Sequence, residues 1–189
     1  MKKLFLLSPV LFCLLIPSSA FSQGFIQPAE GNAVVYFVRV TAFGGMMPFE
    51  FFHDRQLIGR ITGLAYLRYE LPAGESLLWG SSENKEFLQC NLEAEETYLV
   101  LVNVKMGAWT SRLELEPITE KHKEFQRVKE HVNDKPPMQI TEESIAKSME
   151  KLEERGFIDD VMKNYEKKWK NSPATKKITA DMAIPEDML

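Results

Sequence analysis

Between residues 31 and 118 the chain consists of short runs rich in β-branched and aromatic residues, separated by turn-forming residues. In the run YLRYEL, Leu67, Tyr69 and Leu71 alternate with polar residues, which indicates a strand with one buried and one hydrated face. A Pro-Ala-Gly turn follows at residues 72–74, because proline fixes φ and glycine accepts a positive φ. About seven to eight such runs predict a mainly β fold, an antiparallel β-sandwich of immunoglobulin-like or prealbumin-like type.

Residues 97–104, with the sequence TYLVLVNV, are apolar on both faces, which is typical of a central strand covered on both sides. After the last strand the hydrophobic period changes to that of a helix, and a helical extension is predicted over residues 119–170, packed on the sandwich. Thr141 is suited to cap the second helix, and Gly156 to end it. The three apolar stripes are Phe125, Val128 and Val132; Ile145, Met149 and Leu152; and Ile158, Val161, Met162, Tyr165 and Trp169. Residues 171–189 have no period and predict a flexible tail.

Residues 1–22 follow the order of a secretory signal peptide, with two lysines, an apolar run and then small residues. Cleavage after Ala20 or after Ser22 fits the small-x-small rule, and both sites stay open. The apolar run is short for a membrane-spanning helix, which needs about 20 residues. Cys13 lies inside that run and not at a cut, so a lipoprotein is not predicted. We expect a periplasmic or secreted protein, with an uncleaved N-terminal anchor as the alternative.

Loss of this segment leaves Cys90 as the single cysteine, so no intramolecular disulfide can form in an oxidising compartment. Stability must therefore come from the apolar core. Loss of the two N-terminal lysines also takes the formal net charge from -4 to -6. An acidic balance gives no general attraction to nucleic acid, and no such partner is predicted.

The sequence has no G-x-S-x-G, H-E-x-x-H, P-loop or G-x-G-x-x-G pattern. His122 and His131 are nine residues apart and lie on different faces of a helix, so together with His53 they predict surface histidines and not a metal site. Cys90 alternates with leucines, which favours a buried thiol over the alternative of a nucleophile. The acidic clusters fit turns and first turns of helices. No catalytic residue, cofactor or metal is predicted.

Two features are candidates for partner contact. One is an aromatic group made by Phe49, Phe51 and Phe52 beside a Gly-Gly loop, together with Trp109 in a later loop. If exposed, these side chains form the kind of patch that marks a partner surface, and packing in the core is the alternative. The other is a set of lysines that can touch an anionic membrane surface or complement the dipole of the last helix: Lys163, Lys167, Lys168 and Lys170.

Several segments occur in a recognisable order: AVVYFVRV, FEFFHDRQLIGRI, YLRYELPAGESLLWG, TYLVLVNV and MGAWTSRLELEP. Over residues 32–118 this order resembles a domain of unknown function found in secreted and lipid-anchored bacterial proteins. The chain departs from that family by having Asp54-Arg55 where the family tends to have Asp-Gly, and by a longer helical tail. The resemblance implies a β-sandwich on an envelope protein and supplies no catalytic residues.

The sequence therefore predicts an exported bacterial envelope protein that acts as a non-enzymatic binding module for an envelope protein or a glycan. Its expected contact surface is the aromatic region at residues 43–52 with Trp109. One alternative is an envelope hydrolase whose site is assembled from distant residues. A second alternative is a peripheral membrane protein that uses the lysine-rich helix.

Overall fold

The computed structural model describes residues 24–42, 47–106 and 111–189, so the segment predicted as a signal peptide lies outside the described residues. The strands are β1 (Asn32–Arg39), β2 (Phe49–His53), β3 (Gln56–Ile61), β4 (Ala65–Pro72), β5 (Gly74–Ser81), β6 (Lys85–Leu92), β7 (Thr97–Met106), β8 (Ser111–Ile118) and β9 (Lys176–Ile178). The helices are α1 (Phe125–Asp134), α2 (Glu142–Glu154), α3 (Phe157–Asn164), a π-helix η1 (Tyr165–Trp169), and the 3-10 turns η2 (Ala180–Met182) and η3 (Glu186–Met188).

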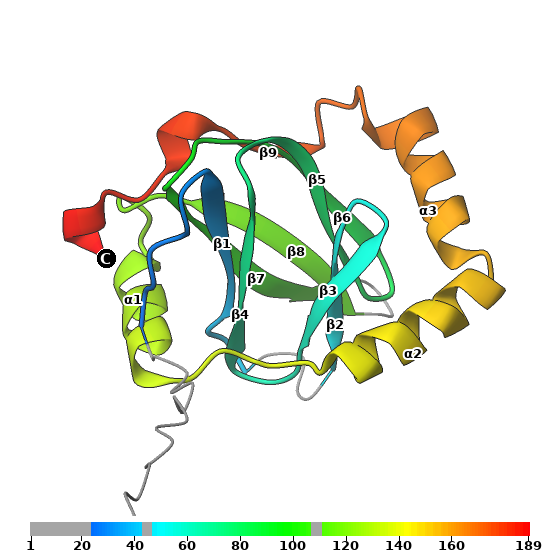
Figure 1. Ribbon diagram of the computed structural model, residues 1–189, viewed down its shortest axis with the longest axis horizontal. Helices are drawn as coiled ribbons and strands as arrows, with labels where there is room; N and C mark the ends of the chain where they lie inside the picture. Colours follow the sequence, from blue (N-terminus) through cyan, green and yellow to red (C-terminus); the bar gives the residue numbers. More distant parts are fainter. Residues whose placement is uncertain (1–23, 43–46, 107–110) are drawn as a thin grey trace, which may run out of the picture.

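The strands form two sheets, with the orders β4-β1-β7-β8 and β3-β2-β5-β6-β9 (Figure 1). A mainly β fold was predicted, and the two-sheet structure confirms it. The expectation of purely antiparallel pairing was wrong, because β1 pairs with β7, and β6 with β9, in parallel. Each sheet is therefore mixed.

The two sheets pack against each other through a shared apolar core. β1 shows how alternation builds it: Ala33, Val35 and Phe37 point into the core between the sheets, and the intervening residues point outward. From the second sheet, Phe51 meets Phe37 with ring centroids 4.8 Å apart. Both faces of β1 are buried, as its continuous apolar sequence requires.

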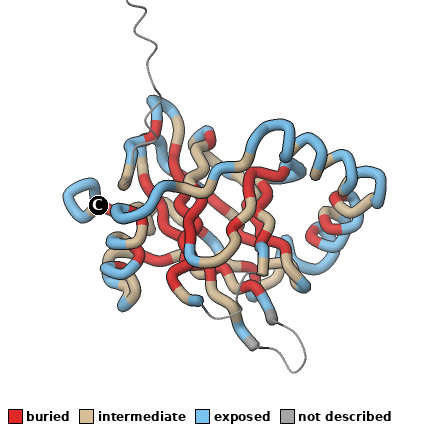
Figure 2. The backbone as a smooth tube through the Cα atoms, turned by 90° about the horizontal axis from the view of Figure 1, so that it is seen from below, coloured by how far each residue is buried: buried red, intermediate tan, exposed pale blue. Residues whose placement is uncertain are grey.

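Helix α1 covers the outer face of the first sheet. Phe125, Val128 and Val132 are buried against outward residues of β1 and β7, including Tyr36 and Leu99. The strand at residues 97–104 is thus covered on both sides, as its apolar sequence indicated, whereas α2 and α3 pack on the other sheet. Figure 2 shows buried residues gathered in the interior of the molecule and exposed residues around its periphery.

Helix α3 covers the outer face of the second sheet. Ile158 and Val161 pack on Phe52, Trp79 and other outward side chains of β2, β3, β5 and β6. Helix α2, which precedes α3, lies against β3 and contains no fully buried residue. Its N-cap was predicted correctly, because Thr141 Oγ1 accepts a hydrogen bond of 3.2 Å from the Ser144 backbone N–H. Gly156 has a φ of 63°, which suits glycine, and separates α2 from α3.

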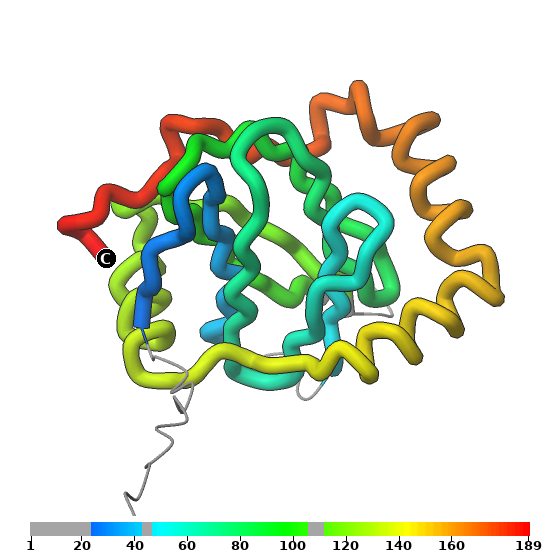
Figure 3. The backbone as a smooth tube through the Cα atoms, viewed as in Figure 1, coloured from blue at the N-terminus to red at the C-terminus, as the bar shows by residue number. Residues whose placement is uncertain are grey.

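The C-terminal segment is not the loose tail that the sequence suggested. After α3 the chain adds β9 to the second sheet and then crosses to the first (Figure 3). Ile184 is buried beside α1, and its backbone N–H donates to the carbonyl oxygen of Thr97 at 2.8 Å. A strand of three residues is too short to show the alternation of apolar and polar side chains that predicts a strand from sequence. The place of β9 in the sheet is set by contacts with residues that are distant in sequence.

Candidate functional site

The aromatic group proposed as a contact surface is buried. Phe49 and Phe51 lie in the core between the sheets, and Phe52 points to the opposite face, as the alternation of side chains along a strand requires. All three have 0% exposure. Phe52 stacks on Trp79 with centroids 3.9 Å apart, and α3 covers it. These residues therefore cannot contact a partner, which corrects the prediction. Trp109 lies outside the described residues.

A cleft of about 760 Å³ opens where α3 and the π-helix pass over the second sheet. Its floor is the end of β5 and β6 that carries Glu75, Gln89 and Asn91, and its wall is the helix face with Tyr165. The β2–β3 turn and the segment around β9 complete the rim. We call this hollow the α3 cleft; its lining residues are Asp54, Arg55, Glu75, Ser76, Leu77, Gln89, Cys90, Asn91, Met162, Tyr165, Glu166, Lys170, Lys177, Ile178 and Thr179.

Gln89 holds the helix wall to the sheet floor. Its side-chain Nε2 donates to the hydroxyl of Tyr165 at 2.9 Å and to the carbonyl oxygen of Lys170 at 2.7 Å. The π-helix begins at Tyr165 and ends just before Lys170, so the two acceptors mark its ends, and single π-turns occur often at functional sites. The cleft is therefore pre-formed by hydrogen bonds between segments that are about eighty residues apart.

The α3 cleft carries balanced charge and many neutral polar groups. Its acidic lining residues are Asp54, Glu75 and Glu166, and its basic ones are Arg55, Lys170 and Lys177. Arg55 pairs with Asp159 on α3, and Lys170 pairs with Glu166 at 3.1 Å. Amides and hydroxyls from Gln89, Asn91, Ser76 and Thr179 lie between the charges. This chemistry favours a polar ligand without large net charge.

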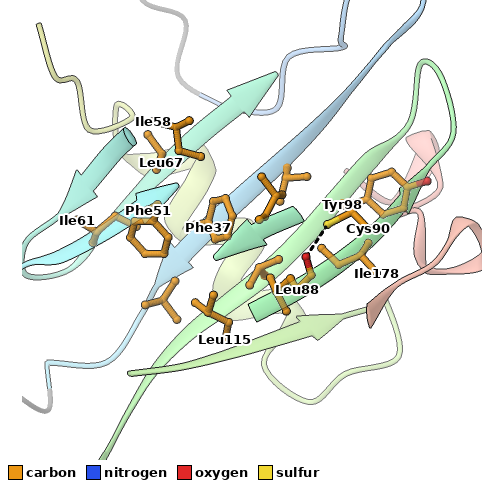
Figure 4. Close-up of a cluster of buried hydrophobic side chains, with 14 of the residues drawn as sticks. Phe37, Phe51, Ile58, Ile61, Leu67, Leu88, Cys90, Tyr98, Leu115 and Ile178 are labelled. Atoms are coloured by element: carbon orange, nitrogen blue, oxygen red, sulfur yellow. Dashed lines mark hydrogen bonds between the residues drawn. The ribbon is translucent and has the colours of Figure 1, made fainter. Parts of the chain in front are cut away.

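Cys90 borders this cleft, and its thiol is buried. It is 5% exposed, and its Sγ donates to the Leu88 carbonyl oxygen at 3.5 Å (Figure 4). Burial raises the pKa of the Cys90 thiol to about 12, so the nucleophilic thiolate is scarce at neutral pH. The predicted buried thiol is confirmed.

His53 forms a short chain of polar contacts at the end of β2. Its Nδ1 and the Tyr69 hydroxyl are hydrogen-bonded at 2.9 Å, and its Nε2 lies 3.5 Å from an Asp54 carboxylate oxygen. Burial, and then the charge of Asp54, raises the pKa of Tyr69. This arrangement was not predicted, because it joins two sheets through one side-chain contact.

The other histidines are separate from the α3 cleft. His122 faces Glu116 at 3.6 Å, and His131 lies edge-on to Tyr66. Among the described residues, no group of three or more His, Cys, Asp and Glu side chains is placed to hold a metal ion.

The lysines considered for membrane contact lie along α3 and the π-helix and are all exposed: Lys163, Lys167, Lys168 and Lys170. Lys170 is engaged with Glu166, while Trp169 beside it is 38% exposed. No helix in the described ranges is both long enough and apolar enough to cross a membrane.

Comparison with known proteins finds no relative of the chain. No model of a known protein family matches the chain, and no curated protein matches it. The residues of the α3 cleft were therefore found by geometry alone. In the sequence, Gln89 and Asn91 alternate with Leu88, Cys90 and Leu92, so strand alternation alone places them on one face, but it does not indicate that α3 lies above them.

Proposed function

We propose that the protein is an exported, non-enzymatic binding module of the bacterial envelope and that the α3 cleft is its ligand site. The observation that carries the proposal is the cleft itself. Five separated parts of the chain build it, and the Gln89 hydrogen bonds fix its helix wall to its floor. The signal-like N-terminus and the resemblance of residues 32–118 to an envelope domain support export.

The expected ligand is a neutral glycan. A saccharide presents many hydroxyl donors and acceptors without net charge, which matches amides and hydroxyls set between compensating ion pairs. Asn91 and Glu75 are exposed on the floor and available to bind such groups. A segment of an envelope protein is the other partner class. Its backbone amides would form hydrogen bonds with the same amide and hydroxyl side chains, so it would compete with a glycan.

Titration with neutral oligosaccharides, chitotriose and maltotriose, tests this function. We expect saturable NMR shifts at residues 75–77 and 89–91 for one of them. Asn91→Ala should weaken binding about tenfold, the size of one or two lost hydrogen bonds. Gln126→Ala removes an exposed amide on α1, beside the other sheet, and is the matched control. Shifts absent at millimolar sugar, or equal loss in both variants, would refute a glycan site here.

An envelope hydrolase is the second candidate, and one observation favours it. Asp54 borders the α3 cleft and contacts His53, which in turn bonds to Tyr69. Hydrolysis of a nitrophenyl ester that is lost in His53→Ala would support that candidate, and equal background rates in both proteins would remove it.

Peripheral membrane binding is the third candidate, favoured by exposed Trp169 among lysines. Aromatic and basic side chains together suit an anionic interface. Cosedimentation with phosphatidylglycerol vesicles that disappears at high salt would support it. Cosedimentation equal to that with phosphatidylcholine would exclude this electrostatic mode.

We also propose the finer fold type. In an immunoglobulin-like sandwich the first two strands share a sheet, whereas β1 and β2 lie in different sheets here. This strand order supports the prealbumin-like alternative, with its first and seventh strands paired in parallel. An experimental structure with β1 and β2 in one sheet would contradict the assignment.

A further inference from the structure

A second, smaller cavity lies on the other side of α3 from the α3 cleft. It has a volume of about 310 Å³ and sits between α3, the end of α2 and the start of β6. Phe87, Phe157 and Trp169 supply its rings, and Lys85 and Arg155 supply its cations. We call it the aromatic pocket. It shares no lining residue with the α3 cleft.

The rings of the aromatic pocket are fixed before any ligand arrives. Phe87 is 4% exposed and lies 6.0 Å from Trp79, which also contacts Phe157 at 6.3 Å. Trp169 packs on Phe87 with centroids 6.1 Å apart and keeps 38% of its surface exposed. Because these protein rings already pack on one another, ordering them on binding costs little conformational entropy. The pocket is therefore preorganised for an apolar group of a ligand.

The polar groups of the aromatic pocket favour a negative charge. Lys85 Nζ lies 5.2 Å above the Phe157 ring and donates to the Ser82 carbonyl oxygen at 3.1 Å, and no carboxylate within the described ranges forms an ion pair with it. Arg155 is exposed on the same rim. Asp160 is the single acidic residue of the lining, so the cations outnumber it. The charge of Glu50 acts on Lys85 without an ion pair between them, and Glu50 is paired with Arg60 at 2.7 Å. A partly buried cation with no carboxylate in contact gains from a ligand carboxylate.

We propose that the aromatic pocket binds a ligand that joins an aromatic ring to a carboxylate, with the ring on Phe87 and Trp169 and the carboxylate between Lys85 and Arg155. Ligand pockets start near 300 Å³, so the volume suits one ring with a short acid chain and not a long lipid tail. The same chemistry occurs in small aryl acids and in the C-terminal aromatic residue of a peptide.

Calorimetry with four probes tests the pocket and separates the two sources. The probes are 3-phenylpropionate, its amide, the peptide Gly-Gly-Phe and the same peptide with an amidated C-terminus. We expect each acid to bind about tenfold more tightly than its amide, the loss of one charge-assisted contact. Stronger binding of 3-phenylpropionate assigns a small acid, and stronger binding of the peptide assigns a chain end. Equal binding of acids and amides, or no binding at millimolar probe, overturns the proposal.

Two variants keep the test independent of folding. Lys85→Met and Arg155→Met should each remove most of the preference for acid over amide. Arg155 is exposed, so its replacement leaves the core intact. Lys163→Met replaces an exposed lysine of α3 outside the pocket and is the matched control. Asn91→Ala changes the α3 cleft and should leave acid binding in the aromatic pocket unchanged. A negative result for the glycan site therefore does not refute the aromatic pocket, and a negative result for the pocket does not refute the glycan site. An acid preference that survives both pocket variants overturns the assignment.

Discussion

Glu70 ties the segment before β1 to strand β4, and its replacement gives a prediction with a defined size and pH dependence. One carboxylate oxygen accepts hydrogen bonds from the Ala29 backbone N–H at 2.8 Å and from Asn32 Nδ2 at 2.9 Å. The other accepts from Arg68 Nη2 at 2.8 Å. The Asn32 bond, the Ala29 bond and then Arg68 lower the pKa of Glu70 from 4.5 to about 2. Glu70→Gln keeps the shape and removes the charge, as protonation does.

The pKa difference sets the expected size of the effect. One pKa unit equals about 1.4 kcal/mol, so a change from 4.5 to about 2 has a ceiling of about 3.4 kcal/mol. The Glu70 side chain is 25% exposed, so water screens part of this, and we expect Glu70→Gln to lower the free energy of unfolding by about 1–2 kcal/mol at pH 7. Because the folded pKa is depressed, the stabilisation is present above pH 4.5 and is lost as the pH falls through about 2.

Urea unfolding followed by tryptophan fluorescence at several pH values measures this difference. The gap between wild type and Glu70→Gln should be constant from pH 7 to about pH 5 and should close toward pH 2, because the variant already mimics the protonated acid. Glu83→Gln replaces an exposed carboxylate and should leave the curve unchanged. A gap that is absent at pH 7, or one that persists undiminished at pH 2, would refute the reasoning.

Three further predictions concern burial. Phe52→Ala should lower the free energy of unfolding in urea by about 3–5 kcal/mol, because it removes a ring stacked on Trp79, and a loss below 1 kcal/mol would contradict its place under α3. Cys90 should resist iodoacetamide at pH 8 until the protein is unfolded, and rapid labelling of the native protein would contradict its raised pKa. Gly80→Ala should cost about 1–3 kcal/mol, because the new Cβ would lie 2.5 Å from Leu113 Cδ2, and an unchanged urea midpoint would mean that the sheets are farther apart.

The local elements could be predicted because their hydrophobic period is written in neighbouring residues. Strand alternation sent Phe51 and Phe52 to opposite faces, and the stripe of Phe125, Val128 and Val132 is the buried face of α1. Pairing between distant segments has no such local signal. The parallel pairing of β1 with β7 and the addition of β9 follow from contacts across the whole chain, so the sequence left them undetermined.

The failure of the aromatic patch has the same origin. Phe52 does point away from the core between the sheets, and the sequence placed it there correctly. Whether that face is a contact surface depends on α3, which returns about a hundred residues later to cover it. The polar floor of the α3 cleft shows the same dependence on distant residues. Gln89 is part of a candidate site only because Tyr165 and Lys170 lie above it and accept its hydrogen bonds.

Both cavities border one helical cover, which is α3 continued by the π-helix over residues 157–169. Helix α3 buries the central aromatic side chains around Trp79, and a cavity lies on either side of it. On one side the exposed strand residues are amides and carboxylates, which gives the polar α3 cleft. On the other side the strand residues are the buried Phe87 and the half-buried Lys85, which gives the aromatic pocket. Because one helix borders both sites, its displacement by a ligand in one cavity would alter the other.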